Sequence, residues 1–114
     1  MKLYLEKNQK VVINNVKVAD TFIGRLNGLM FKKSIERDFA LVISPCNSIH
    51  MFFMKFPLDV LFVDKNNKIV GVNKEIKPWR MSKLYPNASY VVEMSSGIIK
   101  EYEICIGDTI KIAD

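Results

Sequence analysis

The stretch "SIHMFFMKFPLDVLFVD", residues 48–64, is the most hydrophobic run of the chain, yet Lys55, Pro57 and Asp59 interrupt it. A membrane-spanning helix needs about 20 consecutive apolar residues, so the interruptions favour a buried strand pair or one strand with a break. Alternate residues of a strand face opposite sides, and every even position from Phe52 to Phe62 is apolar. The even positions are therefore expected to face the core, with Pro57 at an edge, a bulge or a break.

Further strand patterns lie on both sides of this stretch. They read "FALVIS" at 39–44, "NKIVGVNKEI" at 67–76, "SYVVEMS" at 89–95 and "DTIKIA" at 108–113. The segment "DKNNK", residues 64–68, contains two asparagines, which tolerate left-handed backbone geometry. It is therefore expected to be a hairpin turn between two antiparallel strands.

The N-terminal part of the chain predicts a hairpin followed by a short helix. Residues 2–6 and 10–18 alternate loosely, with turn-forming polar residues between them. Asp20 is a good N-cap, and an apolar stripe at helical spacing follows it in 22–30. Gly24 and Gly28 lie on one flank of this helix beside Arg25, which indicates either close approach of another backbone or merely a weak helix.

A second short helix is expected near residue 98, where Ser95 or Ser96 could cap one or two turns that run to Tyr102. Many short strands with hairpin connections favour a mainly β (α+β) fold. We predict a single domain over residues 1–114. It is a compact antiparallel β-barrel or sandwich, with one short helix after the N-terminal hairpin and a possible short helix near residue 98.

Composition fits one ordinary globular domain. The 114 residues are 49% hydrophobic and 25% charged. The net charge of +5 favours acidic partners, although the basic residues are scattered. The N-terminal "MKLYLEKNQK" lacks the apolar segment of a secretory signal and no transmembrane segment is predicted, so a cytoplasmic location is expected, with Cys46 and Cys105 as reduced thiols.

Asp59 raises the question of a partner, because an unpaired buried carboxylate is costly. Lys55 is a poor candidate, since four residues of extended chain span about 13 Å. Arg25 is the more attractive partner, in a structural pair or at the base of a pocket. Alternatively, Asp59 caps a turn or faces water.

Cys46, His50 and Met54 are spaced four apart and carry soft metal ligands. In an extended strand the first and last would lie about 26 Å apart, so no metal site is predicted. Cys46 and His50 within one loop could instead form a nucleophile and base. The segment "KPWRMSKLYP", residues 77–86, mixes aromatic and basic side chains, which suits anionic or stacking ligands, although a solvated loop explains it as well.

The motifs "RLNGLMF", "IHMFFMKFPLDVLFVDKNNKIV", "YVVEMSSG" and "IGD" stand in the order and spacing of a known family. The chain resembles domain of unknown function 192, also called uncharacterised protein family 0127, from Ala19 to Ile112. Met51 stands where many relatives have Thr. The resemblance implies a compact mainly β domain and no particular reaction, substrate or cofactor. The positions that match the family's recurring residues are Arg25, Gly28, Leu29, Met30, Met54, Pro57, Asp59, Glu93, Gly97, Gly107 and Asp108.

The sequence favours a non-catalytic binding or accessory module for a small anionic ligand or a protein partner. Its predicted ligand-binding residues are Arg25, His50, Asp59 and Glu93, because these polar residues occur where the pattern predicts core or strand ends. One alternative is a small enzyme that uses Cys46 or Asp59 with His50. A second is weak nucleic-acid binding through the basic aromatic loop 77–86.

Overall fold

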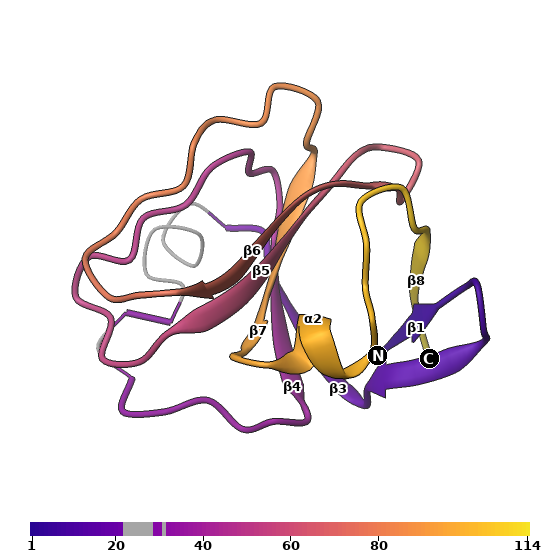
Figure 1. Cartoon of the computed structure of the whole chain (residues 1–114), viewed down its shortest axis with the longest axis horizontal. Coiled ribbons are helices and arrows are strands. Elements are labelled where there is room, and N and C mark those ends of the chain that lie inside the picture. The colour runs from indigo at the N-terminus through magenta and orange to yellow at the C-terminus, as the bar shows by residue number, and fades with distance from the viewer. Residues whose placement is uncertain (22–28, 31) are drawn as a thin grey trace.

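The computed structural model spans residues 1–114 and is described here for residues 1–21, 29–30 and 32–114. Within these residues the chain forms eight strands and one short helix (Figure 1). In chain order they are β1 (Lys2–Leu5), β2 (Lys10–Ile13), β3 (Asn15–Ala19), β4 (Phe39–Ile43), β5 (Leu58–Val63), β6 (Ile69–Ile76), β7 (Tyr90–Ser95), α2 (Ile98–Glu101) and β8 (Ile110–Ala113).

The strands form two open sheets, of order β2-β1-β8 and β3-β4-β7-β5-β6. The predicted mainly β fold is confirmed, as a sandwich-like pair of sheets and not as a closed barrel. Strand β5 lies between β7 and β6 and is buried along its whole length, which explains why the second half of the opening stretch is apolar on both faces. Pro57 precedes this strand directly, at the predicted break.

The predicted N-terminal hairpin is confirmed by the antiparallel pairing of β1 with β2. Its second arm is shorter than expected, because the chain bends at Asn14 and then leaves for the other sheet. Asp38 fixes this bend, since one of its carboxylate oxygens accepts the backbone N–H of Asn14 at 2.7 Å. Strand β3 then pairs with β4 in parallel, the one departure from an antiparallel arrangement among the described strands.

The hairpin predicted at 64–68 joins β5 to β6 as expected. The carboxylate of Asp64 accepts the backbone N–H groups of Asn66 at 2.8 Å and Lys68 at 3.0 Å. Asn67 has a positive φ of 64°, the left-handed geometry that its residue type tolerates. Local turn chemistry therefore determines this connection.

The helix expected near residue 98 is confirmed as α2, but the predicted serine cap is wrong. Gly97 is the N-cap, with a φ of 99°, and as a glycine it has no side chain with which to cap the helix. A left-handed backbone at this position suits glycine and carries the chain from β7 into the helix. The helix predicted over 20–30 falls mostly on residues 22–28, outside the described residues.

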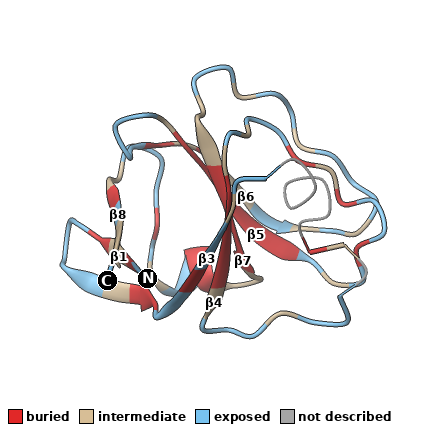
Figure 2. Cartoon of the chain, turned by 180° about the vertical axis from the view of Figure 1, so that it is seen from behind, coloured by how far each residue is buried: buried red, intermediate tan, exposed pale blue. Residues whose placement is uncertain are grey.

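Two apolar clusters lie on opposite faces of the five-stranded sheet. One fills the space between this sheet, α2 and the three-stranded sheet, and includes Leu61, Val92 and Ile99. The other lies beneath the long connections 44–57 and 77–89 and includes Val60, Phe62 and the buried side chains of these connections. Figure 2 shows the buried residues concentrated in the central strands and exposed residues along the connections.

The predicted strand pattern is wrong over residues 52–57, where the chain forms turns instead. Phe53 has a φ of 64°, and the N–H of Met54 bonds to the carbonyl of Met51 at 3.2 Å. Phe52, expected in the core, is exposed. The alternation fails because this segment follows the connection 77–85 rather than a sheet strand. Among the described residues no helix is long and apolar enough to cross a membrane.

Candidate functional site

Asp59 is buried on β5, with 1% of its surface exposed, and its partners are backbone groups. One carboxylate oxygen accepts the N–H of Glu75 at 2.8 Å, and the other accepts those of Gly97 at 3.1 Å and Ile99 at 2.8 Å. The first N–H groups of a helix have no partner within it, so this carboxylate caps α2 from a neighbouring strand. Asp59 thus acts as a cap, one of the roles left open by the sequence, while Arg25 lies outside the described residues.

Glu93 is buried on β7, and its environment differs from that of Asp59. Val60 and Leu41 flank it on the two neighbouring strands. Burial raises the pKa of Glu93 to about 7. One of its carboxylate oxygens accepts no hydrogen bond from any residue that the structure describes. A carboxyl group in this setting favours its protonated form.

The two buried carboxyl groups lie on opposite faces of the same sheet. In the register of β5 with β7, Asp59 is opposite Met94 and Val60 is opposite Glu93. Cross-strand partners share a face and successive residues alternate, so the sheet separates the two side chains. Asp59 and Glu93, both predicted as ligand-binding residues, therefore do not belong to one cluster.

His50 lies in the connection before β5, where its contacts are with Met81 and Phe52 rather than with Asp59 or Glu93. It forms an isolated bridge with Met81, and its Nδ1 accepts the N–H of Phe52 at 3.2 Å. Its ring also stacks on the Phe52 ring, with 4.9 Å between the centroids. His50 therefore belongs to an aromatic group.

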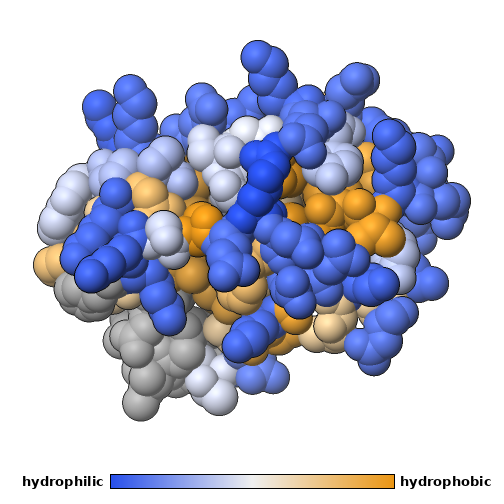
Figure 3. Space-filling model, turned by 90° about the horizontal axis from the view of Figure 1, so that it is seen from below, coloured by the Kyte–Doolittle hydropathy of each residue, from blue (hydrophilic) through white to orange (hydrophobic). Residues whose placement is uncertain are grey.

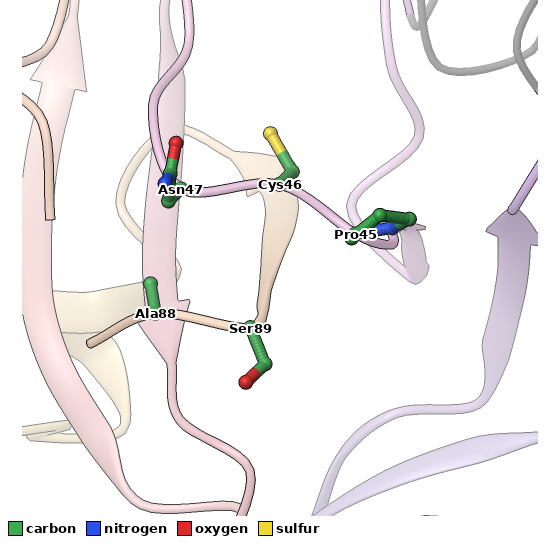
Figure 4. A pocket seen from close by; sticks show the side chains of 5 residues that line it. All are labelled: Pro45, Cys46, Asn47, Ala88 and Ser89. Carbon is green, nitrogen blue, oxygen red and sulfur yellow. The ribbon is translucent and has the colours of Figure 1, made fainter. Parts of the chain in front are cut away.

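Cys46 lines a pocket of about 310 Å³ together with Pro45, Asn47, Ala88 and Ser89 (Figure 4). The thiol lies 3.0 Å from the carbonyl oxygen of Ser48, and the Ser89 hydroxyl points the other way. None of these lining residues is a His, Asp or Glu. Across the part of the chain that the structure describes, no three His, Cys, Asp or Glu side chains are placed to hold a metal ion.

The connections before β5 and after β6 are joined by backbone hydrogen bonds. The N–H of Met51 bonds to the carbonyl of Arg80 at 2.7 Å, and the N–H of Trp79 bonds to the carbonyl of Met51 at 2.8 Å. Further along, the N–H of Ser82 donates to the carbonyl of Ile49 at 3.0 Å, and the Ser82 hydroxyl oxygen accepts the N–H of Ile49 at 2.9 Å. The two connections therefore form one irregular antiparallel unit.

Apolar side chains project from this unit into solvent. Trp79 is 59% exposed, Met81 66% and Leu84 60%. The Phe53 and Trp79 rings meet edge to face at 5.0 Å, and Phe52 lies 5.9 Å from Trp79. We call these five apolar residues and the four basic residues of the same connections the aromatic–basic surface. It consists of Phe52, Phe53, Lys55, Lys77, Trp79, Arg80, Met81, Lys83 and Leu84.

Two of these rings sit on unusual backbone. Phe53 has a φ of 64° and Trp79 a φ of 67°. A bulky side chain in this region costs of the order of 1–3 kcal/mol, so the surrounding structure must hold it there. The hydrogen bond from the Trp79 N–H provides part of that support.

Tyr85 anchors the second connection to the sheet. Its ring stacks on Phe62 with 4.0 Å between centroids, and its backbone N–H bonds to the carbonyl of Asn47 at 2.9 Å. The ring also lies against Gly71, where an added Cβ would be 2.2 Å from a ring carbon. Only glycine at position 71 leaves room for this packing.

The charge of the surface is of one sign. Residues 44–57 and 77–88 contain Lys55, Lys77, Arg80 and Lys83, and no Asp or Glu. Hydrophilic side chains cover much of the molecule, with apolar ones between them, as Figure 3 shows for one side. Isolated exposed apolar residues are thus ordinary, whereas rings in mutual contact are informative.

Six of the nine residues of this surface lie in the basic aromatic loop 77–86 that the sequence singled out. Phe52, by contrast, was predicted in the core. A local signal was present, because Pro57 and Lys55 interrupt the apolar run beside Phe53. The pairing of this segment with 77–85 is a long-range contact that no local pattern encodes.

The fold and its surface define a small mainly β domain with two open sheets. The model of the family DUF192, described as "Uncharacterized ACR", matches residues 3–112. The chain belongs to this family, as its motifs predicted.

Three curated relatives are each named UPF0127 protein. The protein of Thermococcus sibiricus is 39% identical over 107 residues, which cover 89% of this chain and 68% of the relative. That of Pyrococcus horikoshii is 41% identical over 102 residues, or 84% and 85% of the two chains. That of Pyrococcus furiosus is 33% identical over 114 residues, or 96% and 95%.

Two solved structures share the fold. A protein of unknown function from Novosphingobium aromaticivorans superposes with a TM-score of 0.83 at 18% identity, covering 97% of this chain and 82% of that one. A protein from Sinorhizobium meliloti, named as a candidate transcription regulator, gives a TM-score of 0.79 at 20% identity, covering 96% and 89%. At these identities the likeness concerns the fold alone.

Proposed function

We propose that the protein is a non-catalytic binding module that recognises an anionic partner through the aromatic–basic surface. The observation that carries the proposal is the contact among Phe52, Phe53 and Trp79, whose rings meet in solvent. Contiguous exposed apolar groups with a polar rim are typical of interaction sites. The class of function is the one the sequence favoured, while the binding surface is different.

Backbone strain supports this choice of surface. Phe53 and Trp79 both adopt left-handed backbone, a region that bulky side chains rarely occupy. Strained residues cluster at ligand-binding sites because the strain presents a side chain in one fixed direction. The hydrogen bonds around Met51 hold that direction before any partner arrives, which lowers the entropy cost of binding.

The sign of the charge supports an anionic partner. Four basic side chains and no acidic one lie in the two connections, within a chain of net charge +5. A positive field of this kind accelerates encounter with negatively charged surfaces. We place this activity in the cytoplasm, as the sequence predicted, and the thiols of Cys46 and Cys105, which are not joined in a disulfide, suit that compartment.

The enzyme alternative is less well supported. The Asp59 carboxylate is engaged by three backbone N–H groups beneath α2. The Nδ1 of His50 accepts a backbone N–H, and the thiol of Cys46 lies against a backbone carbonyl. A catalytic nucleophile and its base require side chains that lie within hydrogen-bond distance of each other.

The test uses Trp79, the single tryptophan of the chain, as a fluorescent reporter within the surface. The folded protein is titrated with three anionic probes: sodium polyglutamate, an oligothymidylate and vesicles that contain phosphatidylserine. At least one probe is expected to change Trp79 emission, with an affinity that falls as salt rises. If none of the three changes the emission at low salt, the proposed function is wrong.

Matched variants locate the binding. Leu84→Ser and Lys83→Glu should weaken it, since both positions belong to the surface. Ile106→Ser and Lys65→Glu are the controls, because Ile106 is 62% exposed and Lys65 is also exposed, both outside the surface. Equal loss of binding in surface and control variants would contradict the assignment of the surface.

A further inference from the structure

We infer that the partner of the aromatic–basic surface is the headgroup region of an anionic lipid bilayer, onto which the protein docks peripherally. This inference rests on the proposed function and specifies its partner. It follows from the kinds of side chain that are exposed and from their position in the fold.

The side chains are those that a lipid interface accommodates. Met81 and Leu84 are the most exposed apolar members of the surface, and neither side chain can stack on a base or donate a hydrogen bond. Hydrocarbon accepts apolar groups of any shape, so it solvates these two together with Phe52, Phe53 and Trp79. Tryptophan in particular favours the boundary, where its ring lies in apolar surroundings and its N–H reaches polar groups.

The basic side chains complement the same target. Lys55, Lys77, Arg80 and Lys83 are all exposed in the same two connections. Long basic side chains can lay their methylene stems along apolar surface and extend the charge to lipid phosphates. Attraction of this kind is strongest for the anionic lipids of the cytoplasmic leaflet.

The position of the surface allows a plane to approach it. The tips of the two connections lie together at the left end of the long axis in Figure 1, while β1, β8 and both chain termini lie toward the other end. The longest extent of the molecule is 35 Å, and along this axis the two tips lie opposite the three-stranded sheet. Docking through this end leaves the termini facing away from the bilayer.

Nucleic acid would use the rings less well. His50 already covers one face of Phe52, and Phe53 meets Trp79 edge to face, so these rings are engaged with each other. Base stacking requires a free ring face for each base. The two aliphatic side chains would remain exposed in such a complex, whereas a bilayer buries them.

The experiment compares vesicles of phosphatidylcholine alone with vesicles that also contain phosphatidylserine. Binding is followed by co-sedimentation and by Trp79 emission, with brominated acyl chains as a quencher confined to the hydrocarbon region. The full chain is expected to sediment with the anionic vesicles only, with a blue shift and quenching of Trp79. Leu84→Ser should weaken binding about tenfold, because it removes one buried apolar side chain.

The controls separate this inference from the proposed function. Ile106→Ser should bind anionic vesicles as the unmodified chain does, and melting temperatures check that each variant folds. If polyglutamate or oligothymidylate changes Trp79 emission and anionic vesicles do not, the membrane inference is overturned and the binding module stands. If no probe acts, both fail. Vesicle binding that survives Leu84→Ser and Lys83→Glu unchanged, or that occurs without quenching of Trp79, would also overturn it.

Discussion

Replacing Asp59 by asparagine tests the cap of α2, because the two side chains have nearly the same shape. The carboxylate accepts three backbone N–H groups at 2.8, 3.1 and 2.8 Å in a buried site. An amide has one oxygen, so its NH₂ group must face at least one of these donors. Asp59→Asn therefore leaves the N–H of Glu75, or those of Gly97 and Ile99, without an acceptor.

The loss is large in free energy. A hydrogen bond to a charged group contributes about 1.5–3 kcal/mol, and an unpaired buried N–H costs about 1–3 kcal/mol. We expect Asp59→Asn to lower the free energy of unfolding by about 3 kcal/mol. With an m-value of about 2 kcal/mol/M, the urea midpoint falls by about 1.5 M.

Asp64 provides the matched control, since its carboxylate also accepts two backbone N–H groups but is less buried. Both N–H groups bond to the same oxygen of Asp64, and the amide oxygen of asparagine can accept both, so Asp64→Asn should cost less than about 1 kcal/mol. Equilibrium urea unfolding, followed by circular dichroism, measures both variants. Equal midpoints for the two would refute the view that Asp59 is a buried cap.

Three further predictions concern other parts of the molecule. Burial raises the pKa of Glu93 from 4.5 to about 7, so the folded state holds this proton more tightly than the unfolded state. The stabilisation from this proton is complete below pH 4.5 and is lost as the pH rises to about 7. Over these 2.5 pH units, at about 1.36 kcal/mol each, the free energy of unfolding should fall by about 3 kcal/mol relative to that of Glu93→Gln. Parallel pH profiles for the two proteins would contradict this prediction. Gly71→Ala should cost about 1–3 kcal/mol through its clash with Tyr85, and much less in a Tyr85→Ala background; a double-mutant cycle without coupling would refute the packing argument. Iodoacetamide should label exposed Cys105 faster than the half-buried Cys46, and much faster labelling of Cys46 would instead favour the enzyme alternative.

The parts of the fold that were predicted correctly have local causes. The hairpin after β5 follows from the asparagines of 64–68, and the burial of β5 follows from its continuous apolar run. The parallel pairing of β3 with β4 was missed, because Asp38 bends the chain at Asn14 from 24 residues away. Contacts at that separation leave no period in the sequence.

The predicted site failed to form a single cluster for a geometric reason. Asp59 and Glu93 were grouped as polar residues in apolar strands, and both are indeed buried. Whether they share a face depends on the register of β5 against β7, in which Asp59 is opposite Met94. A shift of one residue would have placed them on the same face, and no single strand encodes that register.

The aromatic–basic surface is coupled to the core through alternate residues of one short segment. Met51 and Met54 are buried at 0% and 5% exposure, while Phe52 and Phe53 between them are exposed. The backbone groups of Met51 also bond to Trp79 and Arg80 on the other connection. The packing of Met51 and Met54 in the core therefore holds the neighbouring rings in place. Because folding already fixes the positions of these rings, they lose little conformational entropy when a partner binds. The apolar run at 48–64 turns at residues 52–57 before β5 begins, and this turn brings Phe52 and Phe53 to the surface.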